Sequence, residues 1–131
     1  MFDNTPMKNA LLSICIPTYN RAYRLNDLLA LLVYEIKPLN GSVEVVVCDN
    51  CSTDDTRQVA SQYKEIRLVK YFRNSQNIGI ASNIMHVPSL STGKYCWIIG
   101  DDDLPKIGSI SRIDVHIDHI CIASKASRCS M

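Results

Sequence analysis

Three consecutive aspartates, Asp101, Asp102 and Asp103, follow directly after Gly100 and an apolar run that ends at Ile99. Adjacent carboxylates repel one another unless a cation or cationic side chains compensate their charge. Oxygen-only ligands suit Mg²⁺ and Mn²⁺, and Mg²⁺ is typically bound through one or two carboxylates together with substrate phosphates. A solvated acidic turn before a helix would use the same residues. The glycine permits a close approach to the backbone, and it favours the divalent-metal site.

Two further polar clusters follow apolar runs earlier in the chain. Residues 18–21 (TYNR) come after the first run, and Asp49 and Asn50 come after the second. Tyr19 could offer its ring to a nucleotide base, or it could pack beside the following helix. Asp49 could hydrogen-bond a ribose or a base edge, or it could belong to an ordinary turn. Because ligands of an open parallel sheet bind beyond the carboxyl ends of its strands, three polar strand ends together favour a binding site.

The elements that must position these residues alternate between strand and helix. Short apolar, β-branched runs predict strands over residues 11–17, 43–48, 66–72 and 94–99. Apolar spacing and cap signals predict helices over residues 21–36, from 52 to about 64, and from 80 to about 87. Residues 52–55 (STDD) have the form of a capping box, and Asn20 is placed to cap the first helix. The fold class predicted is α/β, an open and mainly parallel sheet with helices on both faces.

Composition limits the class of protein. The chain has 131 residues, 47% of them hydrophobic and 21% charged, which is enough for one compact domain with a packed core. The formal net charge is +1 and there is no basic block, so no nucleic-acid partner is expected. The first ten residues lack the apolar core of a signal peptide, and the six cysteines are expected to be reduced thiols of a cytoplasmic protein.

Four short segments carry a resemblance to a known family. They are residues 13–21 (SICIPTYNR), 46–56 (VVCDNCSTDDT), 77–79 (NIG), and 93–95 (GKY) leading into 100–103 (GDDD). In order and spacing, over residues 12–105, they resemble the family 2 glycosyltransferases of the GT-A fold, whose nucleotide-binding half is Rossmann-like. Within that family, the sequence is most similar to the bacterial abequosyltransferase type, which adds deoxysugars to O-antigen.

This resemblance implies a site for a nucleotide-diphosphate sugar and for Mg²⁺ or Mn²⁺. The residues implied to contact the nucleotide are Pro17, Thr18, Tyr19, Asp49 and Asp102. The residues implied to hold the metal ion are Asp103 and Asp101. The implied reaction is inverting, metal-dependent transfer of a glycosyl group to an acceptor hydroxyl in cell-surface polysaccharide or lipopolysaccharide synthesis. The implied acceptor is a glycan or a lipid-linked molecule, which allows peripheral contact with the inner face of the plasma membrane.

The sequence departs from the family pattern in three places. Gly100 stands where many members have the first acid of the metal motif, and Ser82 stands where many have an arginine before the asparagine. The family's catalytic base lies beyond the metal motif, in a region that the tail of this chain does not resemble, so the base is not assigned. We therefore expect an N-terminal extension over residues 1–10, a nucleotide-sugar-binding part over 11–106, and a helix with an irregular, truncated tail over 107–131.

Other classes of function use some of the same residues. Cys48 and Cys51 form a Cys-x-x-Cys pair at a strand end, which could make a zinc or redox site with His119 and with Cys121 or Cys129. A phosphoacceptor domain that binds Mg²⁺ for regulation would need acids after the first strand, where this chain has none. A catalytically inactive nucleotide- and metal-binding fragment is the alternative interpretation of the glycosyltransferase motifs.

Overall fold

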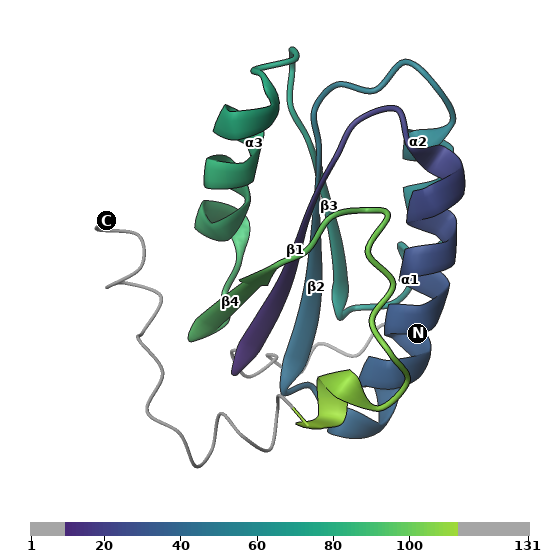
Figure 1. The fold of residues 1–131 in the computed structure, drawn as a ribbon, viewed down its shortest axis with the longest axis vertical. Helices are drawn as coiled ribbons and strands as arrows, with labels where there is room; N and C mark the ends of the chain where they lie inside the picture. Colours follow the sequence, from purple (N-terminus) through teal and green to yellow (C-terminus); the bar gives the residue numbers. More distant parts are fainter. Residues whose placement is uncertain (1–9, 113–131) are drawn as a thin grey trace.

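The computed structural model describes residues 10–112, which form an α/β sandwich around one parallel sheet (Figure 1). The four strands are β1 (Leu12–Thr18), β2 (Val43–Asp49), β3 (Val69–Arg73) and β4 (Tyr95–Ile98). Their order in the sheet is β3-β2-β1-β4, and every neighbouring pair is parallel. The predicted fold class is therefore confirmed.

The two central strands, β1 and β2, are covered on both faces. Their pairing runs in register from Leu12 opposite Val43 to Thr18 opposite Asp49. Almost every residue of both strands is buried, including the polar ones. This explains why the two segments read as continuous apolar runs rather than as alternating patterns, since a strand buried on both faces has no polar side.

Two helices cover one face of the sheet, α1 (Ala22–Ile36) and α2 (Thr56–Ser61) (Figure 1). The apolar stripe predicted from helical spacing is confirmed for α1, because the side chains that form it, Leu25, Leu28, Leu29, Leu32 and Ile36, are fully buried. These side chains pack on alternate residues of β1 and β2 and form the larger hydrophobic core.

The opposite face is covered by α3 (Ile80–His86) and a following 3₁₀ turn, η2 (Val87–Leu90) (Figure 1). A smaller core lies beneath them and contains Cys15, Val46, Cys48 and Val87. A short 3₁₀ turn, η1 (Lys37–Leu39), ends α1 before the left-handed residue Asn40. Within residues 10–112, none of the helices combines the length and apolar character needed to cross a bilayer.

A buried charged network ties together the amino ends of the strands on the α3 face. The carboxylate of Glu44 accepts hydrogen bonds from Ser13 Oγ (2.5 Å), from Lys70 Nζ (2.7 Å) and from the backbone N–H of Thr92 (2.7 Å). Burial alone would raise the pKa of Glu44, but the hydrogen bonds from Lys70 and Ser13 outweigh it and hold the pKa below its usual value. The network therefore joins residues at the starts of β1, β2 and β3 to the segment that leads into β4.

The predicted capping box at residues 52–55 is wrong. The helix α2 begins only at Thr56 and ends at Ser61, and Asp54 rather than Ser52 accepts from the backbone N–H of its first residue. The reason is competition for Ser52, whose hydroxyl and backbone N–H both donate to Asp49. The predicted cap at Asn20 is also wrong, because its side-chain oxygen accepts from the backbone N–H groups of Thr53 and Asp54 instead. The strand predicted from residue 66 begins later, at Val69.

The predicted helix after residue 107 lies mostly outside the described residues. Residues 109–112 are helical, and its remaining positions are beyond residue 112.

Candidate functional site

The carboxyl ends of β2, β1 and β4 bring the predicted polar clusters to one edge of the sheet. Asp49 is paired with Thr18 in the register of β1 and β2. The hydroxyl of Thr18 donates to Asp101 Oδ2 at 2.8 Å, although the two residues are 83 positions apart in the sequence. The expectation that these three strand ends meet is therefore confirmed.

A cleft of about 460 Å³ opens at this edge, between the end of β1 and helix α3. It is lined by Pro17, Thr18, Tyr19, Asn20, Arg21, Asn50, Ile80, Asn83, Ile84, Gly100 and Asp101. Three of the residues predicted to contact a nucleotide are among them, and Tyr19 is the exposed aromatic of the set. The cleft combines apolar walls with a few polar groups, which is the usual character of a small-molecule site.

The acidic turn after β4 divides its three aspartates between two environments. Asp101 is buried and bonded to Thr18, whereas Asp102 and Asp103 are exposed. Burial raises the pKa of the Asp101 carboxyl, against the lowering effect of the Thr18 hydrogen bond. Asp101 therefore lines the cleft with its carboxylate bonded to β1, and its role as a metal ligand stays a prediction.

Because Gly100 has no side chain, the carboxylates of Asp102 and Asp103 can converge in the space beside its Cα atom. A Cβ atom on Gly100 would lie 2.9 Å from Asp103 Oδ2 and 3.0 Å from Asp102 Oδ1, so both oxygens border the same small volume. The turn is closed by Asp103 N–H donating to Gly100 O at 3.1 Å, and Gly100 N–H donates to Asp103 Oδ2 at 3.2 Å. Arg21 approaches the same turn, with its Nη1 at 3.9 Å from Asp102 Oδ2.

This arrangement fits Mg²⁺ or Mn²⁺ as a cation held by two carboxylates. Among residues 10–112, no group of three acidic, histidine or cysteine side chains is arranged to hold a metal ion. Two carboxylates alone leave most positions of an octahedral ion open, and Mg²⁺ usually fills these with water and substrate phosphates. The geometry therefore suits a metal that arrives together with a phosphorylated ligand.

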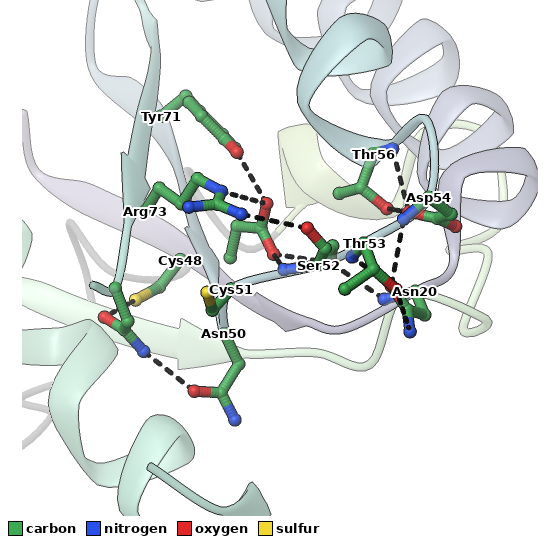
Figure 2. Close-up of polar contacts among 12 residues, drawn as sticks. Asn20, Cys48, Asn50, Cys51, Ser52, Thr53, Asp54, Thr56, Tyr71 and Arg73 are labelled. Atoms are coloured by element: carbon green, nitrogen blue, oxygen red, sulfur yellow. Dashed lines mark hydrogen bonds and ion pairs between the residues drawn. The ribbon is translucent and has the colours of Figure 1, made fainter. Parts of the chain in front are cut away.

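Asp49 is fully buried, and its carboxylate is surrounded by Ser52, Tyr71 and Arg73, which are labelled in Figure 2. Its Oδ1 accepts from the backbone N–H of Ser52 at 2.9 Å and from its hydroxyl at 2.5 Å. Its Oδ2 accepts from Tyr71 Oη at 2.6 Å and lies 3.8 Å from Arg73 Nε. Burial, together with the hydrogen bond to Asp49, raises the pKa of the Tyr71 hydroxyl. The contact between Asp49 and a base stays a prediction, and it requires one of these donors to be exchanged for the ligand.

The cleft is also lined by two asparagines, Asn50, which the sequence placed in a polar cluster without a role of its own, and Asn83, which it did not assign to the site. Asn50 is saturated, because it donates to Asn77 Oδ1 (2.8 Å) and accepts from the N–H of Ile78 (2.9 Å) and from Asn74 Nδ2 (3.0 Å). Asn83 donates to the carbonyl of Cys48 at 3.1 Å. The signal available in the sequence for this network was the clustering of Asn74, Asn77 and Asn83 in one segment, together with Asn50 at a strand end. Buried polar groups need hydrogen-bond partners, and nearby amides can supply them.

The Cys-x-x-Cys pair has no zinc-site geometry in the described residues. Cys48 is buried and donates to Asn83 Oδ1 at 3.2 Å, and Cys51 points to the carbonyl of Ser75 at 3.7 Å. Burial, with a contribution from the Asp49 charge, raises the pKa of Cys48 to about 11, which disfavours the thiolate that a metal requires. The other proposed ligands, His119, Cys121 and Cys129, lie outside the described residues.

Comparison with known proteins identifies the class to which this fold and cleft belong. Residues 13–119 match the model of Glycosyl transferase family 2. Because this match spans most of the chain, the chain belongs to that family.

The relatives include bacterial and eukaryotic sugar transferases. The chain is 36% identical over 110 residues to abequosyltransferase RfbV of Salmonella typhimurium, which covers 82% of this chain and 33% of that protein. It is 28% identical over 123 residues to dolichyl-phosphate beta-glucosyltransferase of Dictyostelium discoideum, covering 86% of this chain and 37% of that protein. The chain thus spans about a third of the length of these curated relatives.

Solved structures confirm the GT-A-like fold. TarS of S. aureus in complex with UDP superposes with a TM-score of 0.74 at 27% identity, covering 82% of this chain and 32% of that chain. The mannosyltransferase PcManGT from Pyrobaculum calidifontis, solved with GDP-Man and Mn²⁺, superposes with a TM-score of 0.65 at 25% identity, covering 76% and 29% of the two chains.

Proposed function

We propose that this chain is the donor-binding part of a glycosyltransferase that transfers a sugar from a nucleotide diphosphate to an acceptor hydroxyl. The observation that carries the proposal is the convergence of Asp102 and Asp103 over Gly100, at the end of a cleft that Thr18 and Tyr19 line. A nucleotide in this cleft would bring its phosphates toward the two carboxylates, and a divalent cation would link the two groups.

Each part of the site has a proposed role. Pro17, Thr18 and Tyr19 form the wall for the nucleoside, with the Tyr19 ring available for stacking on the base. Asp102 and Asp103 hold Mg²⁺ or Mn²⁺. When bound, the cation neutralises the charge that develops on the leaving diphosphate. The proposed roles keep Asp103 as a metal ligand and put Asp102 in the place of Asp101, because Asp101 is bonded to Thr18.

The relatives support this choice of ligand. The structures of TarS contain UDP in one case and UDP-GlcNAc in another, and PcManGT contains GDP-Man and Mn²⁺. We extend the ligand class, a nucleotide-diphosphate sugar with a divalent cation, to this chain. Inversion at the anomeric carbon, a glycan or lipid-linked acceptor of O-antigen type, and a cytoplasmic location at the membrane surface belong to the same proposal.

Calorimetric titration with UDP, CDP, GDP and dTDP, each with and without Mn²⁺, tests the proposal. We expect one nucleotide to bind measurably more tightly with Mn²⁺, and we expect Asp102→Asn and Asp103→Asn each to remove that metal-dependent gain. The matched control is Asp27→Asn, an exposed carboxylate of α1 outside the cleft. Folded protein that binds none of the four nucleotides, or that binds them equally well without metal, would overturn the proposal.

A further inference from the structure

Few hydrogen bonds and ion pairs join the acidic turn at residues 100–103 to the rest of the sheet. The last backbone hydrogen bond between β1 and the β4 segment joins Ile99 N–H to Cys15 O at 3.0 Å. Beyond it, within the described residues, β1 and its loop reach the turn through Thr18–Asp101 and Arg21–Asp102. The orientation of the turn must therefore come largely from side chains.

The two contacts differ in strength. Arg21 and Asp102 are both about half exposed and 3.9 Å apart, and exposed ion pairs of this kind contribute little. The Thr18 hydroxyl and the Asp101 carboxylate are both buried and 2.8 Å apart, and a buried hydrogen bond to a charged group is among the stronger ones. Thr18 therefore carries most of the restraint on the turn.

Asp101 directly precedes Asp102 and Asp103, the two carboxylates that are proposed to hold the metal ion. Its neighbours Asp102 and Asp103 fold back over Gly100 in a turn closed by the Asp103 N–H. Once the Asp101 carboxylate is anchored to β1, the turn cannot rotate as a unit, and the two exposed carboxylates stay beside the cleft. Release of Asp101 would free the turn to swing into solvent.

We infer that Thr18 is a positioning residue that sets the metal-facing carboxylates in place through Asp101. Its hydroxyl proton is donated to Asp101, so this hydroxyl does not donate to the nucleotide at the same time. Through its hydroxyl, Thr18 then contributes to the metal-dependent part of nucleotide affinity, while the rest of its side chain remains part of the cleft wall. This inference rests on the proposed function, because it concerns the same site.

The test uses two variants that separate the hydroxyl from the shape of the side chain. Thr18→Val keeps the β-branched form and removes the hydroxyl, whereas Thr18→Ser keeps the hydroxyl. The quantity measured is the ratio of nucleotide dissociation constants without and with Mn²⁺, with circular dichroism and thermal unfolding as checks of folding. We expect Thr18→Val to reduce this ratio about tenfold, with Thr18→Ser within about threefold of the parent.

A double-mutant cycle tests whether Thr18 acts through Asp101. If it does, Thr18→Val combined with Asp101→Ala will cost no more than the larger single change, since each removes the hydrogen bond between Thr18 and Asp101. Additive effects, or a Thr18→Val variant that weakens metal-free and metal-dependent binding equally, would overturn the inference and make Thr18 a direct nucleotide contact. A parent protein with no Mn²⁺-dependent nucleotide binding would instead overturn the proposed function, and this inference with it.

Discussion

At the scale of single residues, Gly100 lacks the carboxylate that the family motif often has, but its lack of a side chain leaves room for the neighbouring carboxylates. The family pattern often has an acid at this position, but here any side chain would enter the space that borders Asp102 and Asp103. In this chain the two acids that follow fold back over the glycine.

Replacing Gly100 with alanine should damage metal binding without damaging the fold. Gly100 is not among the residues with positive φ, so its backbone accepts alanine, but the added methyl group would displace two carboxylate oxygens. We expect about a tenfold loss of Mn²⁺-dependent nucleotide affinity by calorimetry, with an unchanged unfolding midpoint. Gly93→Ala is the contrasting variant, because its methyl group would meet the backbone N of Ser13 at 2.7 Å. That variant should lower stability by about 1–3 kcal/mol.

Asp49 should matter more for stability than its position in a binding motif suggests. Asp49→Asn keeps the size of the side chain but leaves Arg73 without its charged partner and turns an acceptor into a donor opposite Ser52 or Tyr71. We expect a loss of about 3 kcal/mol in urea unfolding. Asp27→Asn, on an exposed position of α1, should change stability by less than about 0.5 kcal/mol. Equal effects of the two changes would show that the Asp49 network contributes no net stability.

The meeting of Thr18, Asp49 and Asp101 at one edge could be predicted from sequence, but their individual partners could not. Parallel strands place their carboxyl ends together whatever the side chains are. Which side chain turns inward depends on partners from distant segments, such as Tyr71 and Arg73 of β3 around Asp49. No local pattern encodes these pairings.

At the scale of elements, the two central strands were predicted closely, whereas the start of α2 was predicted too early. A strand buried on both faces is marked by its own apolar run, as β1 and β2 are. The start of α2 depends instead on which acceptor Ser52 finds, and Asp49 supplies one from the end of β2. A capping-box motif predicts only local hydrogen bonds, and here the contact between Ser52 and Asp49 replaces them.

The buried Glu44 network should make the stability of the sheet depend on pH. The pKa of Glu44 in the folded protein is held below the unfolded value of 4.5, so its stabilising effect is present above that value and is lost as the pH falls through the lower folded pKa. We expect Glu44→Gln to cost about 2 kcal/mol at pH 7 and progressively less below about pH 4.5, measured by urea unfolding across pH. Glu65→Gln, at an exposed position, is the control. A cost that stays constant down to about pH 3 would contradict the assignment to Glu44 ionisation.

At the scale of the whole molecule, apolar side chains remain exposed on and beside α3. Ile80 is 79% exposed and Met85 is 75% exposed, and Ile78 and Met85 line a second hollow next to the cleft. Apolar surface of this kind promotes association between molecules. The fold class and the family could be predicted from the sequence, but the extent of this uncovered surface required the packed structure.

We therefore expect concentration-dependent self-association of this polypeptide. Sedimentation velocity should show a growing oligomer fraction up to about 100 μM, and Met85→Lys should reduce it, because a charge on α3 opposes burial of that face. Tyr34→Lys is the matched control, since Tyr34 is 71% exposed on α1, which covers the opposite face (Figure 1). Equal effects of the two changes would show that α3 is not the surface involved.

In the parallel sheet β3-β2-β1-β4, the residues that hold the strands together and the residues that line the cleft lie at opposite ends of the strands. The Glu44 network ties the amino ends together, and the cleft with its acidic turn occupies the carboxyl ends. Substitutions in the loops that follow the strands can therefore alter ligand choice while the opposite end maintains the sheet. Apart from Asp49, whose hydrogen bonds also stabilise the carboxyl end, ligand choice and stability can be altered at opposite ends of the strands.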